Sequence, residues 1–267
     1  SRIAFLSDRA NCPSWIPGDS NACDTNFDVP PTAGNVYVLE VSTGEVTRVS
    51  DLAVTEPPVW VTDTRLSLAV TNPADPLSPE RALWLADLST GSVRQMRASS
   101  NDSQPIYSGE AWSPDGTKLI VLDSSGGANR VVLLRDDGTL IASDERLTFP
   151  RFGMVASWSP DGARIALGGL VGQCPYGRVV IDTALTETNG SFAYTAAPGV
   201  PQPNSMCSPT FSRNSQFAAF MGVTGSATGA VDGRADVYVV NNNGFGQANL
   251  TGNLRGNVRL LGWVGGQ

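Results

Sequence analysis

The sequence predicts an all-β protein, a five-bladed β-propeller of four-stranded antiparallel blades, and three observations support this prediction. An aromatic-led motif recurs five times along the chain, 46 to 53 residues apart. A second motif, centred on a turn, recurs in phase with the first. The chain ends complete one copy of the first motif, because WVGGQ at 263–267 continues in register into SRIAFL at 1–6. These features predict a ring of sheets that the C-terminal strand closes by joining the N-terminal blade.

The aromatic-led motif predicts the two inner strands of each blade. Its clearest copies are AWSPDGTKLIVL at 111–122 and SWSPDGARIALG at 157–168, with variants at Trp60, Phe211 and Trp263. Proline at the second position and glycine at the fourth position of SPDG are typical of a type I turn. We therefore interpret the aspartates of SPDG as turn residues rather than catalytic groups, and the aromatic side chains as core between neighbouring blades.

The second motif predicts the outer hairpin of each blade. STG stands at 42–44 and 89–91, and DDG stands at 136–138, each between two apolar stretches. Glycine at the third position suits a turn that needs a positive φ. The fourth copy, VVIDTALTETNGSFAY at 179–194, departs from this pattern. We expect a longer outer hairpin there.

These repeats divide the chain into a single domain of five blades. Each later blade is continuous in sequence, whereas the first is assembled from both chain ends. It takes its innermost strand from 258–264 and its other strands from 3–6, 37–41 and 45–49. The expected boundaries are 258–267 with 1–50 for blade one, 51–98 for blade two, 99–147 for blade three, 148–199 for blade four and 200–257 for blade five. Such closure leaves no open sheet edge in the ring.

WSPDG followed by a strand pair with an STG or DDG turn resembles the TolB-like (WD40-like) β-propeller repeat. SRIAFLSDR at 1–9 is similar to the second strand of that repeat. The resemblance covers nearly the whole chain and is clearest in blades one, three and four. TolB-like repeats occur in periplasmic interaction proteins, in substrate-gating domains of prolyl-oligopeptidase-like peptidases and in surface proteins. TolB itself has six blades and an additional N-terminal α/β domain, so the resemblance implies a relative and not TolB itself.

Composition excludes several functional classes. A formal charge of -7 argues against a nucleic acid partner, which would need a basic surface. The chain contains no run of eighteen apolar residues, so we expect no membrane insertion. Because it contains no histidine, serine-histidine and cysteine-histidine catalysis and histidine-ligated zinc are excluded. No pair of carboxylates matches a glycosidase motif, and we expect neither an enzyme nor a catalytic residue.

The long loops are expected to gather on one face of the propeller, opposite the SPDG and STG turns. Loops that grow on one face of a rigid scaffold commonly carry binding. Aromatic rings with polar neighbours on this face suit a protein interface or stacking on a sugar. The alternative is that the same rings cap the blades and cover the central channel. The candidate ligand-binding residues are Trp15, Phe27, Tyr107, Arg151, Phe152 and Tyr176.

An acidic loop, DSNACDTNFD at 19–28, offers carboxylate and amide oxygens at near-alternate positions. Asp19, Asp24 and Asp28 could contribute to a Ca²⁺ site, because Ca²⁺ takes six to eight oxygen ligands. The loop lacks the central glycine and terminal glutamate of an EF-hand. The alternative is a solvated loop rich in Asx turns. We expect no other cofactor.

Four cysteines, Cys12, Cys23, Cys174 and Cys207, form no CxxC pair. An even number of widely spaced cysteines in Pro/Gly/Asn-rich segments favours disulfides and an oxidising compartment over free buried thiols. Cys12 with Cys23 and Cys174 with Cys207 are the expected pairs, and two other pairings stay open. All four fall on the long-loop face.

The sequence thus predicts an extracytoplasmic binding or assembly module, either an interaction scaffold or a subunit of a surface structure. The expected partner is a protein, or further copies of the chain, at the cell surface. We expect an extracellular, periplasmic or cell-surface location, with any signal or anchor absent from this chain. The alternative is a carbohydrate-binding, lectin-like propeller or a glycoside-hydrolysing one.

Overall fold

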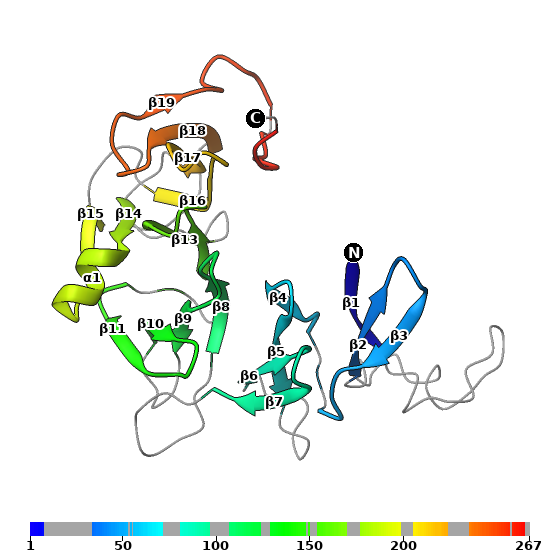
Figure 1. The fold of residues 1–267 in the computed structure, drawn as a ribbon. Helices are drawn as coiled ribbons and strands as arrows, with labels where there is room; N and C mark the ends of the chain where they lie inside the picture. The colour runs from blue at the N-terminus through cyan, green and yellow to red at the C-terminus, as the bar shows by residue number, and fades with distance from the viewer. Residues whose placement is uncertain are drawn as a thin grey trace, which may run out of the picture. The chain divides into compact units, whose positions relative to one another are not determined.

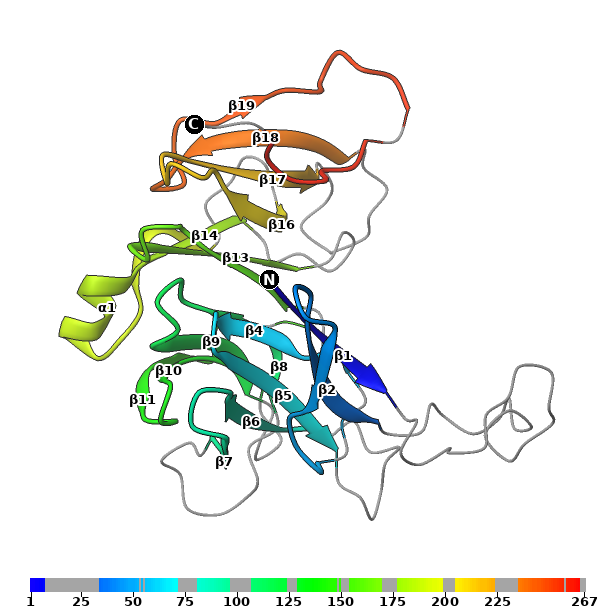
Figure 2. The same cartoon turned by 45° about the vertical axis from the view of Figure 1, so that its right-hand side comes forward.

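The computed structural model describes residues 1–7, 34–52, 54, 56–71, 81–96, 107–123, 129–147, 149, 154–169, 177–198, 205–223, 235–256 and 258–264. The chain divides into two compact units. Unit 1 comprises Ser1–Arg97 and Gln104–Ile106, and unit 2 comprises Ala98–Ser103 and Tyr107–Gln267. The described residues form antiparallel sheets and one short helix (Figures 1 and 2). The all-β class predicted from the sequence is confirmed.

Unit 1 contains two sheets in which strands that follow one another along the chain pair side by side. The first sheet has the order β1-β2-β3, and the second has the order β4-β5-β6-β7. The strands are β1 (Arg2–Ser7), β2 (Asn35–Glu40), β3 (Glu45–Arg48), β4 (Val59–Thr62), β5 (Arg65–Thr71), β6 (Arg81–Asp87) and β7 (Ser92–Gln95).

The core of unit 1 lies between these two sheets. Because side chains of a strand alternate between its two faces, alternate residues of β2 and β5 point into this core, and those buried in it are aliphatic. Val36 and Leu66 are examples, and both are fully buried. Val54 connects the sheets through its backbone. It exchanges two hydrogen bonds of 2.9 Å with Gly34 and forms an isolated bridge with Val70. Each sheet of unit 1 is thereby held against the other.

Unit 2 contains a four-stranded sheet of order β11-β10-β9-β8 and an eight-stranded sheet. The larger sheet consists of two consecutive meanders, β12 to β15 and β16 to β19. Two single parallel pairings join the meanders, Gly169↔Cys207 and Gly177↔Ser205. Its strands appear along the left-hand side of Figure 1. The strands are β8 (Tyr107–Trp112), β9 (Lys118–Asp123), β10 (Arg130–Arg135), β11 (Leu140–Asp144), β12 (Met154–Trp158), β13 (Arg164–Gly169), β14 (Gly177–Asp182), β15 (Ala193–Pro198), β16 (Ser205–Phe211), β17 (Phe217–Val223), β18 (Ala235–Asn241) and β19 (Ala248–Asn249).

The two faces of β13 and β14 pack into different cores. Ile165 and Val179 belong to a cluster that includes β9 and β10, whereas Ala166 and Val180 belong to a cluster with β17 and β18. All four side chains are fully buried. Strands buried on both faces read as continuous apolar runs, as this pair does.

The SPDG segments form the tight turns that the sequence predicts. Gly116 and Gly162 each donate a backbone hydrogen bond of 2.8 Å to the serine three residues earlier. Burial raises the pKa of Asp115, but hydrogen bonds from Ser113 and Thr117 outweigh this effect and lower the pKa below its usual value. The aspartate of SPDG therefore serves as an ionised turn acceptor.

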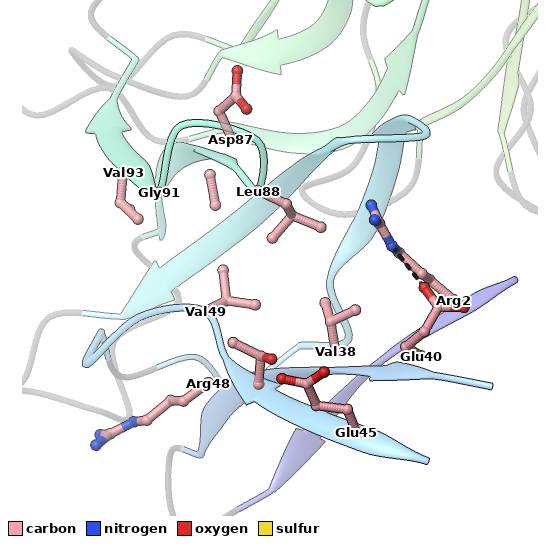
Figure 3. A pocket seen from close by; sticks show the side chains of 12 residues that line it. Arg2, Val38, Glu40, Glu45, Arg48, Val49, Asp87, Leu88, Gly91 and Val93 are labelled. Carbon is pink, nitrogen blue, oxygen red and sulfur yellow. Dashed lines mark hydrogen bonds and ion pairs between the residues drawn. The ribbon is translucent and has the colours of Figure 1, made fainter. Parts of the chain in front are cut away.

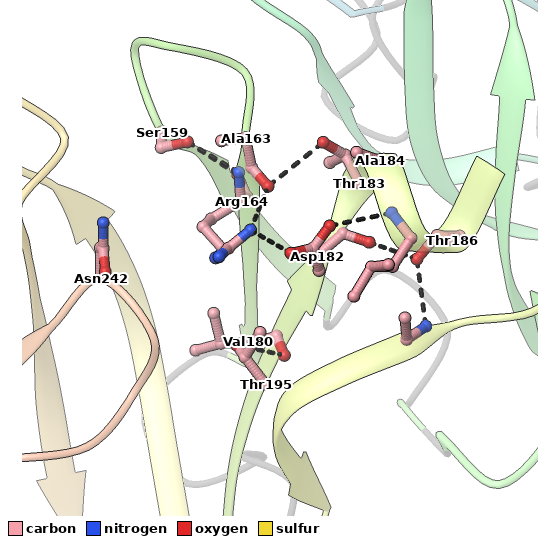
Figure 4. Close-up of polar contacts among 12 residues, drawn as sticks. Ser159, Ala163, Arg164, Val180, Asp182, Thr183, Ala184, Thr186, Thr195 and Asn242 are labelled. Carbon is pink, nitrogen blue, oxygen red and sulfur yellow. Dashed lines mark hydrogen bonds and ion pairs between the residues drawn. The ribbon is translucent and has the colours of Figure 1, made fainter. Parts of the chain in front are cut away.

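The departure of the fourth repeat from the pattern corresponds to a helix. α1 (Thr183–Asn189) lies between β14 and β15. The Asp182 carboxylate caps it by accepting a hydrogen bond of 2.9 Å from the Leu185 amide and also pairs with Arg164 at 2.5 Å (Figure 4). Gly190 ends it in a left-handed conformation. Among the described residues, no helix has the length and hydrophobicity of a membrane-spanning segment.

A repeated indole contact places the C-terminal segment against the last meander of unit 2. Trp158 donates its Nε1 hydrogen to the carbonyl of Ala111 at 2.9 Å, and Trp263 donates to the carbonyl of Thr210 at 3.0 Å. Both acceptors directly precede the anchor aromatic of the motif, Trp112 or Phe211. Trp263 thus makes the contact that an anchor aromatic makes to the preceding sheet.

The strand expected over 258–264 is not formed in the described structure. This segment carries no strand, although Leu260 packs near Met221 and donates its amide to the Met221 sulfur at 3.2 Å. Gly262 has a φ of 140°, which a paired extended strand does not adopt. The sheet of β1 accordingly has three strands where its neighbour in unit 1 has four. The count of five blades and the closure of the ring stay predictions.

Candidate functional site

A groove between the β2–β3 and β6–β7 hairpins of unit 1 is the candidate site, with a cavity volume of about 350 Å³. It lies between β2 and β3 on one side and the β6–β7 hairpin on the other. Figure 3 shows Val38, Val49 and Leu88 between these hairpins and the ion pair of Arg2 with Glu40 at one end. We call it the STG groove, lined by Arg2, Val38, Glu40, Glu45, Thr47, Arg48, Val49, Ala86, Asp87, Leu88, Gly91 and Val93.

Two equivalent turns frame the STG groove. The carboxylate of Glu40 accepts a hydrogen bond of 3.0 Å from the hydroxyl of Ser42, at the start of the first STG turn. The carboxylate of Asp87 accepts bonds from the Ser89 amide at 2.9 Å and the Ser89 hydroxyl at 2.5 Å, at the start of the second. An acidic side chain two residues before the serine of Ser-Thr-Gly is an Asx or Glx-type turn acceptor. The same local chemistry therefore places a carboxylate at both hairpins.

Two carboxylates of the STG groove, Glu40 and Asp87, have lowered pKa values. The Ser42 hydroxyl, and then Arg2 at 3.1 Å, lower the pKa of Glu40. The Ser89 hydroxyl lowers the pKa of Asp87. Arg48 reaches Asp51 at 2.9 Å, in an exposed pair that water screens. The groove consequently presents both signs of charge around an aliphatic floor.

A second, wider hollow of about 660 Å³ adjoins the STG groove and shares Arg2 and Glu40 with it. It is lined further by Trp60, Asp63 and Thr64. Arg2 donates a long hydrogen bond of 3.4 Å to the Asp63 carbonyl across this hollow. We call it the Trp60 hollow. A partly buried indole beside carboxylate and guanidinium groups gives it an apolar wall with polar contacts at its edge.

The geometry of the STG groove suits binding rather than proton transfer. A general acid or base works best when its pKa lies near the working pH. The pKa values of Glu40 and Asp87 are shifted in the other direction, so both carboxylates remain charged over the physiological range. An aliphatic floor with charged walls can hold an amphipathic side chain or a small polar molecule.

Unit 2 contains a separate polar cluster of Asp144, Arg146 and Tyr194. The Asp144 carboxylate accepts hydrogen bonds from Arg146, the shortest at 2.6 Å, and from the Tyr194 hydroxyl. The Arg146 guanidinium lies 5.6 Å from the centre of the Tyr194 ring. Arg146 lowers the pKa of Asp144 to about 2, and burial raises the pKa of Tyr194. Tyr194 stays protonated, so the cluster has no phenolate that could act as a base. Its hydrogen bonds connect β11 to β15, and we interpret it as a structural contact.

The predicted recognition residues are almost all outside the described residues. Tyr107 is the first residue of β8, and nothing else of that ligand set is described. The Ca²⁺ candidates also lie outside the described residues, and the described part of the chain contains no cluster of three or more His, Cys, Asp or Glu suited to a metal. These site assignments stay predictions. The residues outside are Trp15, Phe27, Arg151, Phe152 and Tyr176, with Asp19, Asp24 and Asp28.

Cys207 is the one cysteine among the described residues. It lies on β16, is fully buried and takes part in a disulfide. Cys12, Cys23 and Cys174 lie outside the described residues, so the pairing stays a prediction.

Sequence reasoning missed the STG groove because it placed recognition on the long-loop face. A signal was available: LEVSTGE at 39–45 and LADLSTGS at 85–92 each carry an acid two residues before Ser-Thr-Gly. Two copies of one motif in consecutive blades place their turns on the same face of the propeller. What the sequence does not show is that the two hairpins leave a hollow between them.

Comparison with known proteins defines the fold. No protein family matches the chain, and no curated protein sequence is significantly similar to it. Among solved structures, a protein assigned as TolB from Agrobacterium tumefaciens is 17% identical with a TM-score of 0.50, over 82% of this chain and 70% of that one. The β-propeller domain of the trilobed protease from Pyrococcus furiosus is 11% identical with a TM-score of 0.52, over 86% and 68%. An oligogalacturonate lyase in complex with manganese is 15% identical with a TM-score of 0.52, over 89% and 61%.

These likenesses identify a β-propeller, and at such identities they define the fold alone. The expected resemblance to TolB-like propellers, as a relative and not TolB itself, is confirmed at this level. The chain spans less than two thirds of the length of the lyase. Because the neighbours include both a lyase and a protease, the fold does not distinguish an enzyme from a binding protein.

Proposed function

We propose that the chain is an extracytoplasmic binding or assembly module, acting as a protein interaction scaffold or a surface-structure subunit. The observation that carries this proposal is the STG groove, an open recess formed between two short hairpins of rigid sheets. Rigid elements hold a binding surface in place before a partner arrives, so less conformational entropy is lost on association. The fold likeness to TolB supports this role and a location outside the cytoplasm.

The STG groove suits an extended protein segment better than a flat protein surface. Its floor is aliphatic, and Glu45 adds a carboxylate that forms no ion pair with a described side chain. A lysine or arginine side chain can lay its aliphatic stem on such a floor and its charge at the carboxylate. The long-loop face with Trp15 and Tyr176 is a second proposed recognition surface on the same module.

Charge reversal at Glu45 tests the groove. A protein captured by the chain from a cell-surface extract is identified, and its affinity is then measured by titration calorimetry. Glu45→Lys is expected to weaken binding at least ten-fold, because it places a cation where the groove accepts one. Glu145→Lys makes the same charge change at an exposed site in unit 2 and is expected to change binding less than two-fold.

The same titration tests the long-loop face through Trp15→Ala and Tyr176→Ala. Weakened binding in these variants with an unaffected Glu45→Lys places recognition on the loops. If neither set of variants changes affinity for the identified partner, both proposed surfaces are refuted.

The Trp60 hollow favours one alternative, carbohydrate binding. An indole wall beside Glu40, Asp63 and Arg2 offers ring stacking and hydrogen bonds to a sugar. The fold likeness to an oligogalacturonate lyase agrees with this alternative. Glycoside hydrolysis would further require a carboxylic acid with a raised pKa. Among the described carboxyl groups, each pKa that departs from its usual value is lowered. A glycan array without specific binding refutes the carbohydrate alternative, and binding lost in Trp60→Ala supports it.

A further inference from the structure

Arg178, the second residue of β14, is a buried cation in unit 2. Its residue exposure is 6%, which is unusual for arginine. Arg178 shares one face of β14 with Val180, and the turn between β18 and β19 covers this face. The turn approaches so closely that a Cβ atom on Gly244 would lie 2.6 Å from the Cβ of Ala196 and 2.9 Å from Cγ2 of Val180.

The partners of Arg178 are neutral. Its Nη1 donates a hydrogen bond of 3.0 Å to Oε1 of Gln247, and its guanidinium carbon lies 5.6 Å from the centre of the Phe245 ring. The Nε hydrogen is buried and has no acceptor among the described residues, and no described carboxylate forms an ion pair with Arg178. A guanidinium has five N–H donors, and this one satisfies a single donor among the described residues.

Burying the Arg178 charge among neutral partners is unfavourable in free energy unless an anion binds to it. A charge removed from water needs an opposite charge and hydrogen bonds to compensate its lost hydration. Burial lowers the pKa of Arg178, and no neighbouring acid offsets that effect. Two half-buried arginines of unit 2 do have such an acid, since Arg164 pairs with Asp182 and Arg130 pairs with Asp123.

We propose that Arg178, with Gln247 and Phe245 around it, forms a binding site for a carboxylate. The planar fork of a guanidinium matches the two oxygens of a carboxylate. A monoanion balances the single buried charge, whereas a dianion would leave a net negative charge in a protein that already carries -7. Phe245, which is 42% exposed, lies against the guanidinium, and the buried Nε hydrogen is the donor that a carboxylate would satisfy. This site lies in unit 2 and is independent of the STG groove.

Acetate is the probe for this site. It is titrated into the ¹⁵N-labelled chain at pH 7, with sodium chloride added to hold the ionic strength constant, while the arginine Nε–H resonances are followed. The Arg178 resonance is expected to shift in a saturable manner with acetate and not with chloride alone. The Tm is expected to rise with acetate concentration over the same range, since a ligand that binds the folded state stabilises it.

Three variants assign the effect. The acetate response is expected to disappear in Arg178→Met and to weaken at least ten-fold in Arg178→Lys, which keeps the charge and loses the fork. Arg146→Met removes an exposed arginine that pairs with Asp144 and is expected to keep the response within two-fold. If Arg178→Met does not fold, the wild-type resonance and Arg178→Lys decide the question.

Two further titrations define the ligand. Sulfate is expected to bind at least ten-fold more weakly than acetate, and equal or tighter sulfate binding overturns the carboxylate assignment. An acetylated aspartyl peptide that binds more tightly than acetate points to an acidic segment of a protein as the source, and equal affinity points to a free carboxylic acid. An Arg178 resonance that does not respond to acetate overturns the proposal, and a lowered Tm in Arg178→Met would then show that Arg178 only holds the β18–β19 turn in place. Because Glu45 belongs to unit 1 and Arg178 to unit 2, failure here and failure of the proposed function are read from different variants and remain distinct results.

Discussion

Replacing Asp144 by asparagine is expected to remove a pH-dependent part of the free energy of unfolding. The pKa of Asp144 falls from its usual 3.8 to about 2, chiefly through Arg146 and with help from the Tyr194 hydroxyl. Each pKa unit corresponds to about 1.4 kcal/mol, so this difference sets an upper value of about 2.5 kcal/mol. Arg146 is 74% exposed and water weakens its contribution, so we expect about 1 to 2 kcal/mol.

The sign of the effect follows from the lowered pKa. The folded state binds the Asp144 proton more weakly than the unfolded state. The stabilising contribution of Asp144 is therefore complete about one pH unit above 3.8 and declines as the pH falls toward 2. For these pKa values roughly half of it is lost at pH 3. The asparagine side chain does not titrate, so the difference between wild type and Asp144→Asn isolates this one group from the other carboxylates.

Urea unfolding of both proteins between pH 6 and pH 3, followed by tryptophan fluorescence, measures this difference. We expect it to be largest at pH 6 and to shrink by about half at pH 3. Tyr194→Phe serves as the companion variant, because it removes one hydrogen bond and keeps the pair of Asp144 with Arg146. A difference between wild type and Asp144→Asn that is constant over this pH range would refute the assignment of a lowered pKa to Asp144.

Two further predictions concern the fold. Deleting 258–267 removes the indole contact of Trp263 with Thr210 and the predicted closing strand, and we expect one cooperative transition at a lower Tm by calorimetry; an unchanged Tm would contradict the predicted ring. Gly244→Ala is expected to destabilise by about 2 to 4 kcal/mol in urea unfolding, because it adds a contact of 2.6 Å to the strain of a φ of 85°. Gly91→Ala is the control, with a φ of 69° and no atom within 4 Å of the new Cβ, and it should cost only about 1 to 2 kcal/mol; equal losses would refute the close approach at Gly244.

Local features of the structure were predictable from the sequence because their causes are local. SPDG forms a turn wherever it stands, since its proline, aspartate and glycine satisfy the backbone within five residues. The short continuous apolar runs in LIVL and RIAL likewise predict buried strands. The one local surprise is α1, where the repeat-based expectation of a longer hairpin hid the capping signal of Asp182 before Thr-Ala-Leu.

The candidate sites were not predictable in the same way. The STG groove depends on how two hairpins from separate sheets pack, and the isolated bridge at Val54 that holds those sheets together has no motif of its own. Asp144 and Tyr194 are 50 residues apart, and Arg178 and Gln247 are 69 residues apart. No motif in the sequence connects the members of either pair.

The sequence by itself determined the all-β class, the repeating strand and turn pattern and the resemblance to TolB-like propellers, because turn chemistry and period-two burial act within a few residues. Only the tertiary structure decided which charges are partnered. It gave Glu40 and Asp144 their arginines and left the buried Arg178 with neutral neighbours. The physical reason is that the energy of a charge depends on its burial and its nearest opposite charge, and both are set by packing between segments far apart in the chain.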